Sequence, residues 1–291
     1  MIRGSIVALV TPFDESGRVN YEKLKELINF QIRNHTDGIL ILGTTGETPT
    51  LSDKEQEEIV RVTVKEVNGR VPVIANSGNN NTEKSIAKSM NFEKLGVDAL
   101  LVITPYYNKP NPSGMVEHFY RIADNVHIPV YIYNVPSRTG SCISVEIVAE
   151  LARHPNISGI KEASGDIAYA SKIARCINSE FDMFCGNDDI TVPLMSLGAA
   201  GAISVWANIM PKEVRQMIHA FEEGEIEGAR KMQLKYLPLI NALFSETNPV
   251  PVKEIMNIAG MQVGNCRLPL GGISLSNRRM LKALHDEYIK A

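Results

Sequence analysis

The chain has 291 residues, 44% of them hydrophobic, so it is long enough to bury a large core in one or two domains. Its net charge is −3 with acidic and basic residues interspersed, so no basic surface is expected that would attract nucleic acid or an anionic membrane. No window approaches about 18 consecutive apolar residues and the apolar run 5–10 is too short for a signal peptide, so we expect no membrane span and no secretion.

The cysteine and histidine residues give no support for a metal site or a disulfide framework. The four cysteines lie far apart and form no Cys-x-x-Cys pair, which is typical of a protein in a reducing cytoplasm. The six histidines show neither His-Glu-x-x-His nor His-x-His spacing, and the motifs of nucleotide-binding proteins and serine hydrolases are absent. We therefore expect no metal and no nucleotide cofactor.

Short runs rich in β-branched residues alternate with longer charged segments of helical period, as in βα units on a parallel sheet. The predicted strands are Ser5–Val10, Gly38–Leu42, Val71–Ala75, Ala99–Ile103, Val130–Tyr133, Ser158–Lys161, Asp182–Cys185 and Ala202–Val205. The predicted helices cover residues 21–34, 53–67, 82–95, 114–125, 145–152, 167–177, 190–197 and 212–223. Residues 52–55, Ser-Asp-Lys-Glu, have the pattern of a capping box at the start of the second helix.

Eight such units predict a closed (β/α)₈ barrel, because an open doubly wound sheet usually has only about five to seven strands. We assign this barrel to residues 1–224. Three further helical patterns follow near residues 225–245, 251–259 and 276–289. No glycine- and serine-rich linker divides the chain, so we interpret residues 225–291 as a C-terminal helical region and not as a second catalytic domain.

The active site of a (β/α)₈ barrel forms at the carboxyl ends of its strands, so unusual residues there are candidates for chemistry. The second strand ends in Gly43-Thr44-Thr45-Gly46-Glu47. The two glycines permit a tight turn whose backbone N–H groups can face an anion, and its size suits a carboxylate. The alternative is an ordinary glycine-rich turn between a strand and a helix.

Tyrosines follow the fourth and fifth strands. Tyr106 and Tyr107 stand between prolines after the fourth strand, an arrangement that suits an interface anchor as well as a catalytic group. Tyr131 and Tyr133 share one face of the fifth strand, and a tyrosine at a strand end can carry protons. Arg138 follows in the loop and can bind a carboxylate through two hydrogen bonds. Taken singly, a core aromatic residue and a surface arginine are the simpler alternatives.

The sixth strand ends in Gly159-Ile160-Lys161-Glu162, which places a lysine at the end of an apolar barrel strand. A lysine amine must lose its proton before it can act as a nucleophile, and burial favours the neutral form. A free amine at this place can form a Schiff base with a carbonyl and withdraw electrons from it. The alternative is a side chain that extends along the barrel to solvent.

Together, four segments resemble the dihydrodipicolinate synthase/N-acetylneuraminate lyase family: Gly43 to Glu47, Tyr106-Tyr107-Asn108, Tyr133 to Gly140 and Gly159 to Glu162. The resemblance runs from residue 4 to residue 270. It implies a class I mechanism in which Lys161 forms an imine with pyruvate and no other cofactor takes part. The residues that match the family's catalytic ones are Lys161, Tyr133, Thr44 and Tyr107. Those that match its substrate-binding ones are Thr45, Arg138, Gly186 and Ile203.

Arg138 distinguishes the branches of this family. It matches the residue that receives the carboxylate of L-aspartate 4-semialdehyde, whereas sugar-acid lyases and aldolases lack the pattern Ser137-Arg138-Thr139-Gly140. The resemblance therefore implies condensation of pyruvate with L-aspartate 4-semialdehyde to 4-hydroxy-tetrahydrodipicolinate, the committed step of diaminopimelate and lysine biosynthesis.

Three other functions stay open. The first is an aldolase or lyase of the same family that acts on N-acetylneuraminate or 2-keto-3-deoxygluconate. The second is a barrel that binds a ligand without catalysis; it predicts gaps in the set of site residues, and the sequence shows none. The third is a phosphate-binding barrel enzyme, which the acidic residues of Gly186-Asn187-Asp188-Asp189 disfavour.

The resemblance also implies an assembly and a form of regulation. Members form homotetramers of tight dimers in which Tyr107 crosses to the neighbouring subunit, although a free dimer is an alternative. Lysine-inhibited members typically carry glutamate and histidine where this sequence has Lys84 and Gln56, while Asn80 and Tyr106 are retained. Because Lys84 repels an ammonium group, we expect weak or absent inhibition by lysine. Residues 248–253, Asn-Pro-Val-Pro-Val-Lys, match the family too, and we expect only a structural role for them.

Overall fold

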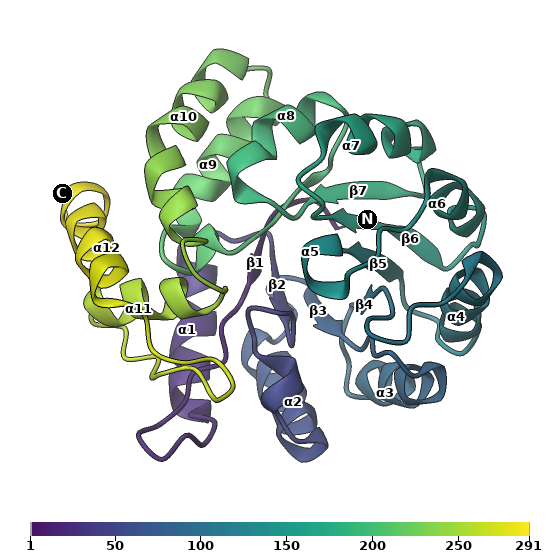
Figure 1. The fold of residues 1–291 in the computed structure, drawn as a ribbon, viewed down its shortest axis with the longest axis horizontal. Helices are drawn as coiled ribbons and strands as arrows, with labels where there is room; N and C mark the ends of the chain where they lie inside the picture. The colour runs from purple at the N-terminus through teal and green to yellow at the C-terminus, as the bar shows by residue number, and fades with distance from the viewer. Residues whose placement is uncertain (1, 291) are drawn as a thin grey trace.

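Eight parallel strands close into a barrel in the computed structural model, which describes residues 2–290 (Figure 1). The strands are β1 (Gly4–Ala8), β2 (Gly38–Ile41), β3 (Val73–Asn76), β4 (Ala99–Ile103), β5 (Val130–Asn134), β6 (Ile157–Glu162), β7 (Asp182–Cys185) and β8 (Gly201–Ser204). Each strand pairs with the next one in sequence, and β8 pairs with β1. The predicted (β/α)₈ barrel is confirmed, with every strand end within two residues of its predicted position.

The register of the strands decides which side chains enter the barrel. Tyr133 of β5 stands opposite Lys161 of β6, which stands opposite Phe184 of β7. Since side chains alternate across a strand, Gly159 is on the same face as Lys161, two residues earlier. A Cβ at Gly159 would lie 3.0 Å from the ring of Tyr131 and 2.4 Å from the carbonyl oxygen of Asp182. Glycine at this position thus leaves space for an aromatic layer inside the barrel.

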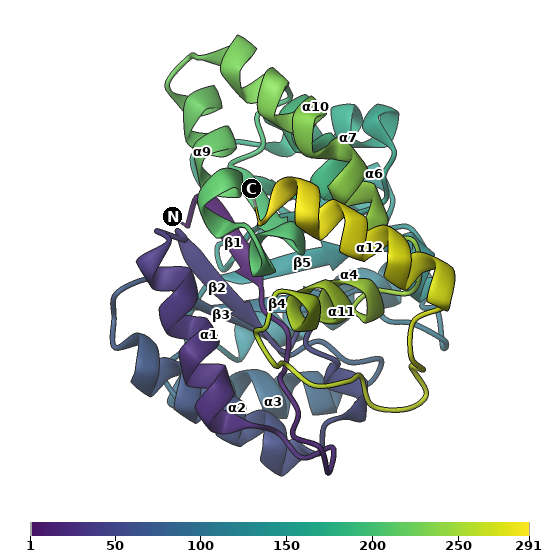
Figure 2. The same ribbon diagram turned by 90° about the vertical axis from the view of Figure 1, so that its left-hand side faces the viewer.

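Helices cover the outside of the barrel (Figure 2). They are α1 (Tyr21–Arg33), α2 (Asp53–Val67), α3 (Thr82–Lys94), α4 (Pro112–Asp124), α6 (Val145–Leu151), α7 (Ile167–Ile173), α8 (Thr191–Ser196) and α9 (Pro211–Glu222). The predicted capping box of α2 is confirmed: the Ser52 hydroxyl accepts from Glu55 N at 3.3 Å, and the Glu55 carboxylate accepts from Ser52 N at 2.9 Å. This cap fixes the start of α2 directly after the glycine-rich turn.

Two details differ from the sequence-based expectation. The sequence predicts a loop at Arg138, but residues Pro136–Thr139 form a single turn of helix, α5. Four residues are too few to show helical periodicity, so the pattern could not reveal this helix. The helix expected over 167–177 ends at Ile173 and continues as a 3₁₀ turn, Ala174–Cys176, a common way for a helix to end.

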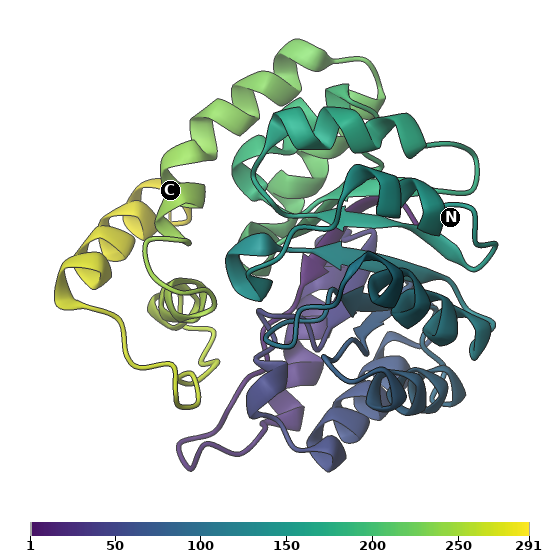
Figure 3. The same cartoon turned by 45° about the vertical axis from the view of Figure 1, so that its right-hand side comes forward.

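Three helices follow the barrel: α10 (Ile226–Ala242), α11 (Val250–Ile258) and α12 (Leu275–Tyr288). Figure 3 shows α11 and α12 standing to one side of the barrel. Aromatic rings join the barrel to these helices. The ring centre of Trp206 lies 5.0 Å from that of Tyr236 in α10, which lies 5.8 Å from the ring centre of Tyr288 in α12. The boundary at residue 224 stays a prediction. No helix in residues 2–290 is long and apolar enough to cross a bilayer.

Candidate active site

Lys161 lies inside the barrel near the carboxyl end of β6, and only 5% of its surface is exposed. Its Nζ is 4.5 Å from the centre of the Tyr133 ring on the neighbouring strand. Gly186 follows β7 on the other side, where a Cβ would lie 3.1 Å from Cε of Lys161. The lysine is therefore enclosed between β5 and β7, and its side chain does not extend to solvent.

Glu162, the next residue of β6, points away from Lys161 and is also buried. Its carboxylate accepts hydrogen bonds from the Asn134 side chain at 2.7 Å and from Ser164 N at 2.6 Å. Burial raises the pKa of Glu162, while these hydrogen bonds oppose the rise. The pair Asn134–Glu162 joins the ends of β5 and β6, the two strands that carry Tyr133 and Lys161.

The turn after β2 is built by hydrogen bonds within itself and from the segment that follows β1. Gly46 N donates to the Gly43 carbonyl at 3.0 Å, and the Thr11 hydroxyl donates to the Gly46 carbonyl at 2.7 Å. Thr45 is buried and Thr44 is half-buried. The turn ends at Glu47, whose backbone has φ 56° and ψ 34°. A side chain in this left-handed region is strained, so the surroundings of Glu47 must hold it there.

Arg138 lies in α5, exposed at the mouth of the barrel. Its guanidinium donates to the backbone carbonyl of Asn248 at 3.0 Å, and the Asn248 side chain donates to the Thr45 hydroxyl at 2.9 Å. Asn248 thus connects two of the predicted substrate-binding residues. The match of residues 248–253 to the family points to this segment but not to these contacts.

Asp188 is a second residue of the site that the sequence does not single out as functional. It follows β7 and is buried, and one carboxylate oxygen accepts from Val205 N at 2.9 Å and Trp206 N at 3.0 Å. Burial raises the pKa of Asp188, while the Ser204 hydroxyl, these two N–H groups and the charge of Lys161 oppose the rise. Asp188 therefore fixes the end of β8, the strand that carries Ile203.

Tyr107 does not pack into the site of its own chain. Its surface is 91% exposed, and its backbone has φ +68°. The preceding residue, Tyr106, is held by the segment before α3, because the Asn80 side chain donates a hydrogen bond to the Tyr106 carbonyl at 3.2 Å. The barrel brings the other seven predicted site residues to its carboxyl end, and Tyr107 also follows a strand there, β4, but its side chain is turned to solvent.

A cavity of about 700 Å³ adjoins the site on the side of α2 and α3. Thr44 and Arg138 line one part of it, and Gln56, Lys84 and Tyr106 line another. Lys161 and Tyr133, which are both buried, are not among the residues that line this cavity. Gln56 is held by Lys88, whose Nζ donates to its side-chain oxygen at 2.8 Å. The described residues contain no cluster of three or more potential metal ligands.

The protein is a closed (β/α)₈ barrel with an amine, hydroxyl groups and an arginine at the carboxyl ends of its strands. These features place it in the class of (β/α)₈-barrel enzymes. A family model described as the dihydrodipicolinate synthetase family matches residues 1–287, and the chain belongs to this family.

Individual relatives agree. A 4-hydroxy-tetrahydrodipicolinate synthase of a Thermoanaerobacter species is 50% identical over 289 residues, which are 99% of this chain and 97% of that one. The enzyme of the same name from Clostridium perfringens is 48% identical over 291 residues, covering 100% and 98% of the two chains. The crystal structure of dihydrodipicolinate synthase from Aquifex aeolicus has a TM-score of 0.96 and 43% identity, with 98% of each chain covered.

Proposed function

We propose that this protein condenses pyruvate with L-aspartate 4-semialdehyde through an imine on Lys161 and forms 4-hydroxy-tetrahydrodipicolinate. The observation that carries the proposal is the buried Lys161 side chain beside Tyr133 at the carboxyl end of the barrel. Membership of the dihydrodipicolinate synthetase family and relatives named for this synthase activity support it. The reaction belongs to diaminopimelate and lysine biosynthesis.

The chemistry requires an amine and a set of proton carriers. The free amine of Lys161 adds to the keto carbon of pyruvate, and water leaves as the imine forms. Loss of a proton from the methyl group gives an enamine, whose terminal carbon attacks the aldehyde carbon of the second substrate. The amino group of that substrate then adds to the imine carbon, which closes the ring and releases Lys161. All intermediates of this scheme are bonded covalently to Lys161, and the scheme needs no cofactor.

The other site residues bind substrates and move protons. Tyr133 gives and takes protons at the imine, and Thr44 and Tyr107 pass them onward. The turn at Thr45 and the backbone of Ile203 hold pyruvate, and Gly186 leaves space beside Lys161. Arg138 receives the carboxylate of L-aspartate 4-semialdehyde, because a guanidinium matches the geometry of a carboxylate.

Because Tyr107 is 91% exposed, its part in the relay requires a second subunit. We propose that Tyr107 enters the site of its dimer partner and that two such dimers form a tetramer. A tyrosine whose ring projects from a strained backbone suits an interface residue. We also place the protein in the cytoplasm, and its four unpaired cysteines agree with a reducing compartment.

Reduction with borohydride in the presence of pyruvate tests the role of Lys161. The wild-type protein should gain a stable mass on Lys161, whereas Lys161→Ala should gain none. Lys235→Ala, which removes a lysine from the middle of α10, is the matched control and should label like the wild type. Equal labelling of wild type and Lys161→Ala contradicts the assignment.

The second substrate is tested by kcat/KM. We expect the highest value for pyruvate with L-aspartate 4-semialdehyde, and much lower values for cleavage of N-acetylneuraminate and 2-keto-3-deoxygluconate. Arg138 favours the first reaction, because the other two substrates present a polyol chain instead of a second carboxylate. A higher kcat/KM for either sugar acid would make the protein an aldolase of the same family.

A further inference from the structure

A short segment outside the barrel, residues 248–253, contacts the glycine-rich turn that carries Thr44 and Thr45 at two places. At one end of this segment, the Asn248 side chain donates to the Thr45 hydroxyl at 2.9 Å. At the other end, Lys253 of α11 donates to Oε1 of Glu47 at 2.9 Å. The two contacts reach residues only two positions apart in the turn. The segment therefore fixes both the middle and the end of the turn.

The ammonium group of Lys253 is buried and fully hydrogen-bonded within the protein. The side chains of Lys253 and Glu47 are 2% and 0% exposed, so water screens their charges little. Besides Glu47, Nζ of Lys253 donates to the carbonyls of Thr11 and Asn265, each at 3.0 Å, and it lies 4.2 Å from the centre of the Phe13 ring. These three hydrogen bonds use all three N–H groups of the ammonium. Thr11 also binds the turn directly, through Gly46.

Glu47 is equally fixed. Oε1 accepts from Lys253, and Oε2 accepts from Arg267 N at 2.8 Å. The same residue has the left-handed backbone that ends the turn, with φ 56°. A non-glycine residue persists in that conformation only when its surroundings determine it. The carboxylate contacts supply this determination, so the direction in which the turn leaves β2 depends on the ion pair.

Stability alone does not explain a buried ion pair at this place. The cost of removing two charges from water commonly cancels their attraction, and apolar residues of similar size often serve stability as well or better. A carboxylate with fixed partners gives instead a unique geometry. The turn in question is the one proposed to hold pyruvate beside Lys161, where small displacements have large effects on rate.

We propose that Lys253 and Asn248 are positioning residues of the active site, which hold the Thr44–Thr45 turn in the geometry that binds pyruvate. Neither residue is proposed to touch the reacting atoms. The proposal rests on the proposed function, because it assigns the turn to pyruvate binding. It gives residues 248–253 a role in the reaction in addition to the structural role expected from the sequence.

The test separates positioning from stability with a neutral double variant, Glu47→Gln/Lys253→Met. This variant removes both charges together, so no unpaired charge is left in the core. We expect its thermal midpoint to stay close to that of the wild type, while KM for pyruvate rises about tenfold. The yield of borohydride trapping at low pyruvate concentration should fall in parallel. Glu254→Gln is the control and should leave KM unchanged. Glu254 lies next to Lys253 on α11, and its ion pair is with Arg278 of α12.

Asn248→Ala provides a second variant without any change of charge, in case the double variant does not fold. It should also raise KM for pyruvate about tenfold. A folded double variant or a folded Asn248→Ala with wild-type KM and wild-type trapping would overturn the proposal. Trapping needs no second substrate, so this comparison holds even if L-aspartate 4-semialdehyde is not the partner of pyruvate. If wild-type Lys161 traps no pyruvate, the proposed function is wrong and the positioning role is wrong with it.

Discussion

Gly186 illustrates how a single atom can limit this site. A Cβ at this position would lie 2.6 Å from Cβ of Ala163, 3.0 Å from the Glu162 carbonyl and 3.1 Å from Cε of Lys161. The first two groups belong to the strand end and its loop and cannot move freely. An added methyl group should therefore shift the backbone at position 186 and displace the flexible lysine side chain from its place beside Tyr133.

We therefore expect Gly186→Ala to lower kcat/KM by about a hundredfold and to slow imine trapping, because the amine no longer approaches the keto carbon correctly. Steady-state kinetics and the rate of borohydride labelling measure the two effects. Gly271→Ala is the matched control, since a Cβ there has no neighbour within 4 Å. Wild-type kinetics for Gly186→Ala would show that the lysine pocket tolerates an extra carbon.

Residues differ in how far the sequence reveals them. The positions of Lys161 and Tyr133 follow from one rule, because both stand at the ends of apolar strands and carry reactive groups. Asn248 could not be found in this way, since its partner Thr45 is 203 positions away in the sequence. The position of Asp188 was equally hidden: its acceptor role depends on where the backbone of β8 ends.

Elements were predictable to the extent that they are long and periodic. The strands and the helices α1 to α4 repeat an apolar pattern over several turns or residues, and the structure confirms them. α5 consists of four residues and has no period to detect, although it carries Arg138. The sequence also could not show that α11 contacts the turn after β2, since that contact is a tertiary one.

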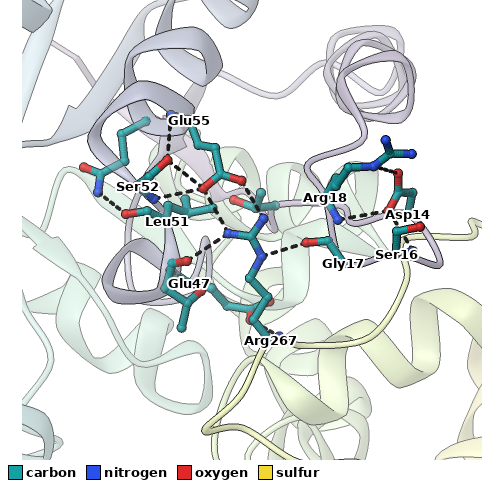
Figure 4. A network of polar contacts seen from close by, with 12 residues as sticks. Asp14, Ser16, Gly17, Arg18, Glu47, Leu51, Ser52, Glu55 and Arg267 are labelled. Carbon is teal, nitrogen blue, oxygen red and sulfur yellow. Dashed lines mark hydrogen bonds and ion pairs between the residues drawn. The ribbon is translucent and has the colours of Figure 1, made fainter.

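The N-terminus of α2 is joined to the C-terminal region by an ion pair (Figure 4). The Arg267 guanidinium donates to both oxygens of Glu55 and to the Gly17 carbonyl at 2.8 Å. This contact, together with the hydrogen bonds from Ser52, lowers the pKa of Glu55 from its usual 4.5 to about 2. In the folded protein Glu55 therefore keeps its charge at pH values where the unfolded chain has already bound a proton.

The contribution of this pair to stability is complete above about pH 5 and is lost as the pH falls from about 4.5 towards 2. We expect the wild type to exceed Glu55→Gln in free energy of unfolding at pH 6, with the difference shrinking steadily through pH 4 and pH 3. Urea unfolding at each pH measures it. Glu57→Gln, at a surface pair with Arg61, is the control. A difference that does not change with pH would contradict the assignment to Glu55.

Helices α2 and α3 form the walls of the cavity in which inhibited relatives are expected to bind lysine. Here Gln56 and Lys84 line it. Lys84 repels the ammonium groups of the effector, so we expect L-lysine to inhibit with a constant of about 1 mM or weaker. Steady-state kinetics with increasing L-lysine measures this constant.

Reversing the charge at Lys84 tests the cause. Lys84→Glu should strengthen inhibition by about tenfold, because an attraction replaces a repulsion. Lys94→Glu, at the other end of the same helix, changes the net charge equally and should have no effect. Micromolar inhibition of the wild type would show that the effector is held by groups other than the one at position 84.

At the scale of the whole molecule, the C-terminal region supports the loops at the carboxyl end of the barrel. We propose that residues 225–291 are a helical region dependent on the barrel and not an independent domain. The Gln233 side chain of α10 donates to the Asp188 carbonyl at 2.9 Å and accepts from Val192 N at 3.1 Å, and Lys253 of α11 binds Glu47. These contacts reach the loops after β2 and β7, on either side of the predicted site. Fold and site are thus built by the same long-range contacts.

Assembly is the last requirement of the proposed reaction, since the role proposed for the exposed Tyr107 requires a partner subunit. If each site uses its own Lys161 and the partner's tyrosine, then Tyr107→Phe and Lys161→Ala subunits are each defective alone but complement one another. Refolding them together at equal amounts should give about a quarter of wild-type activity, because half of the dimers are mixed and each mixed dimer has one complete site of two. Activity no greater than the mean of the two separate variants would place Tyr107 in the site of its own chain or outside the reaction. Mixing with Lys235→Ala in place of Lys161→Ala gives the reference for refolding yield.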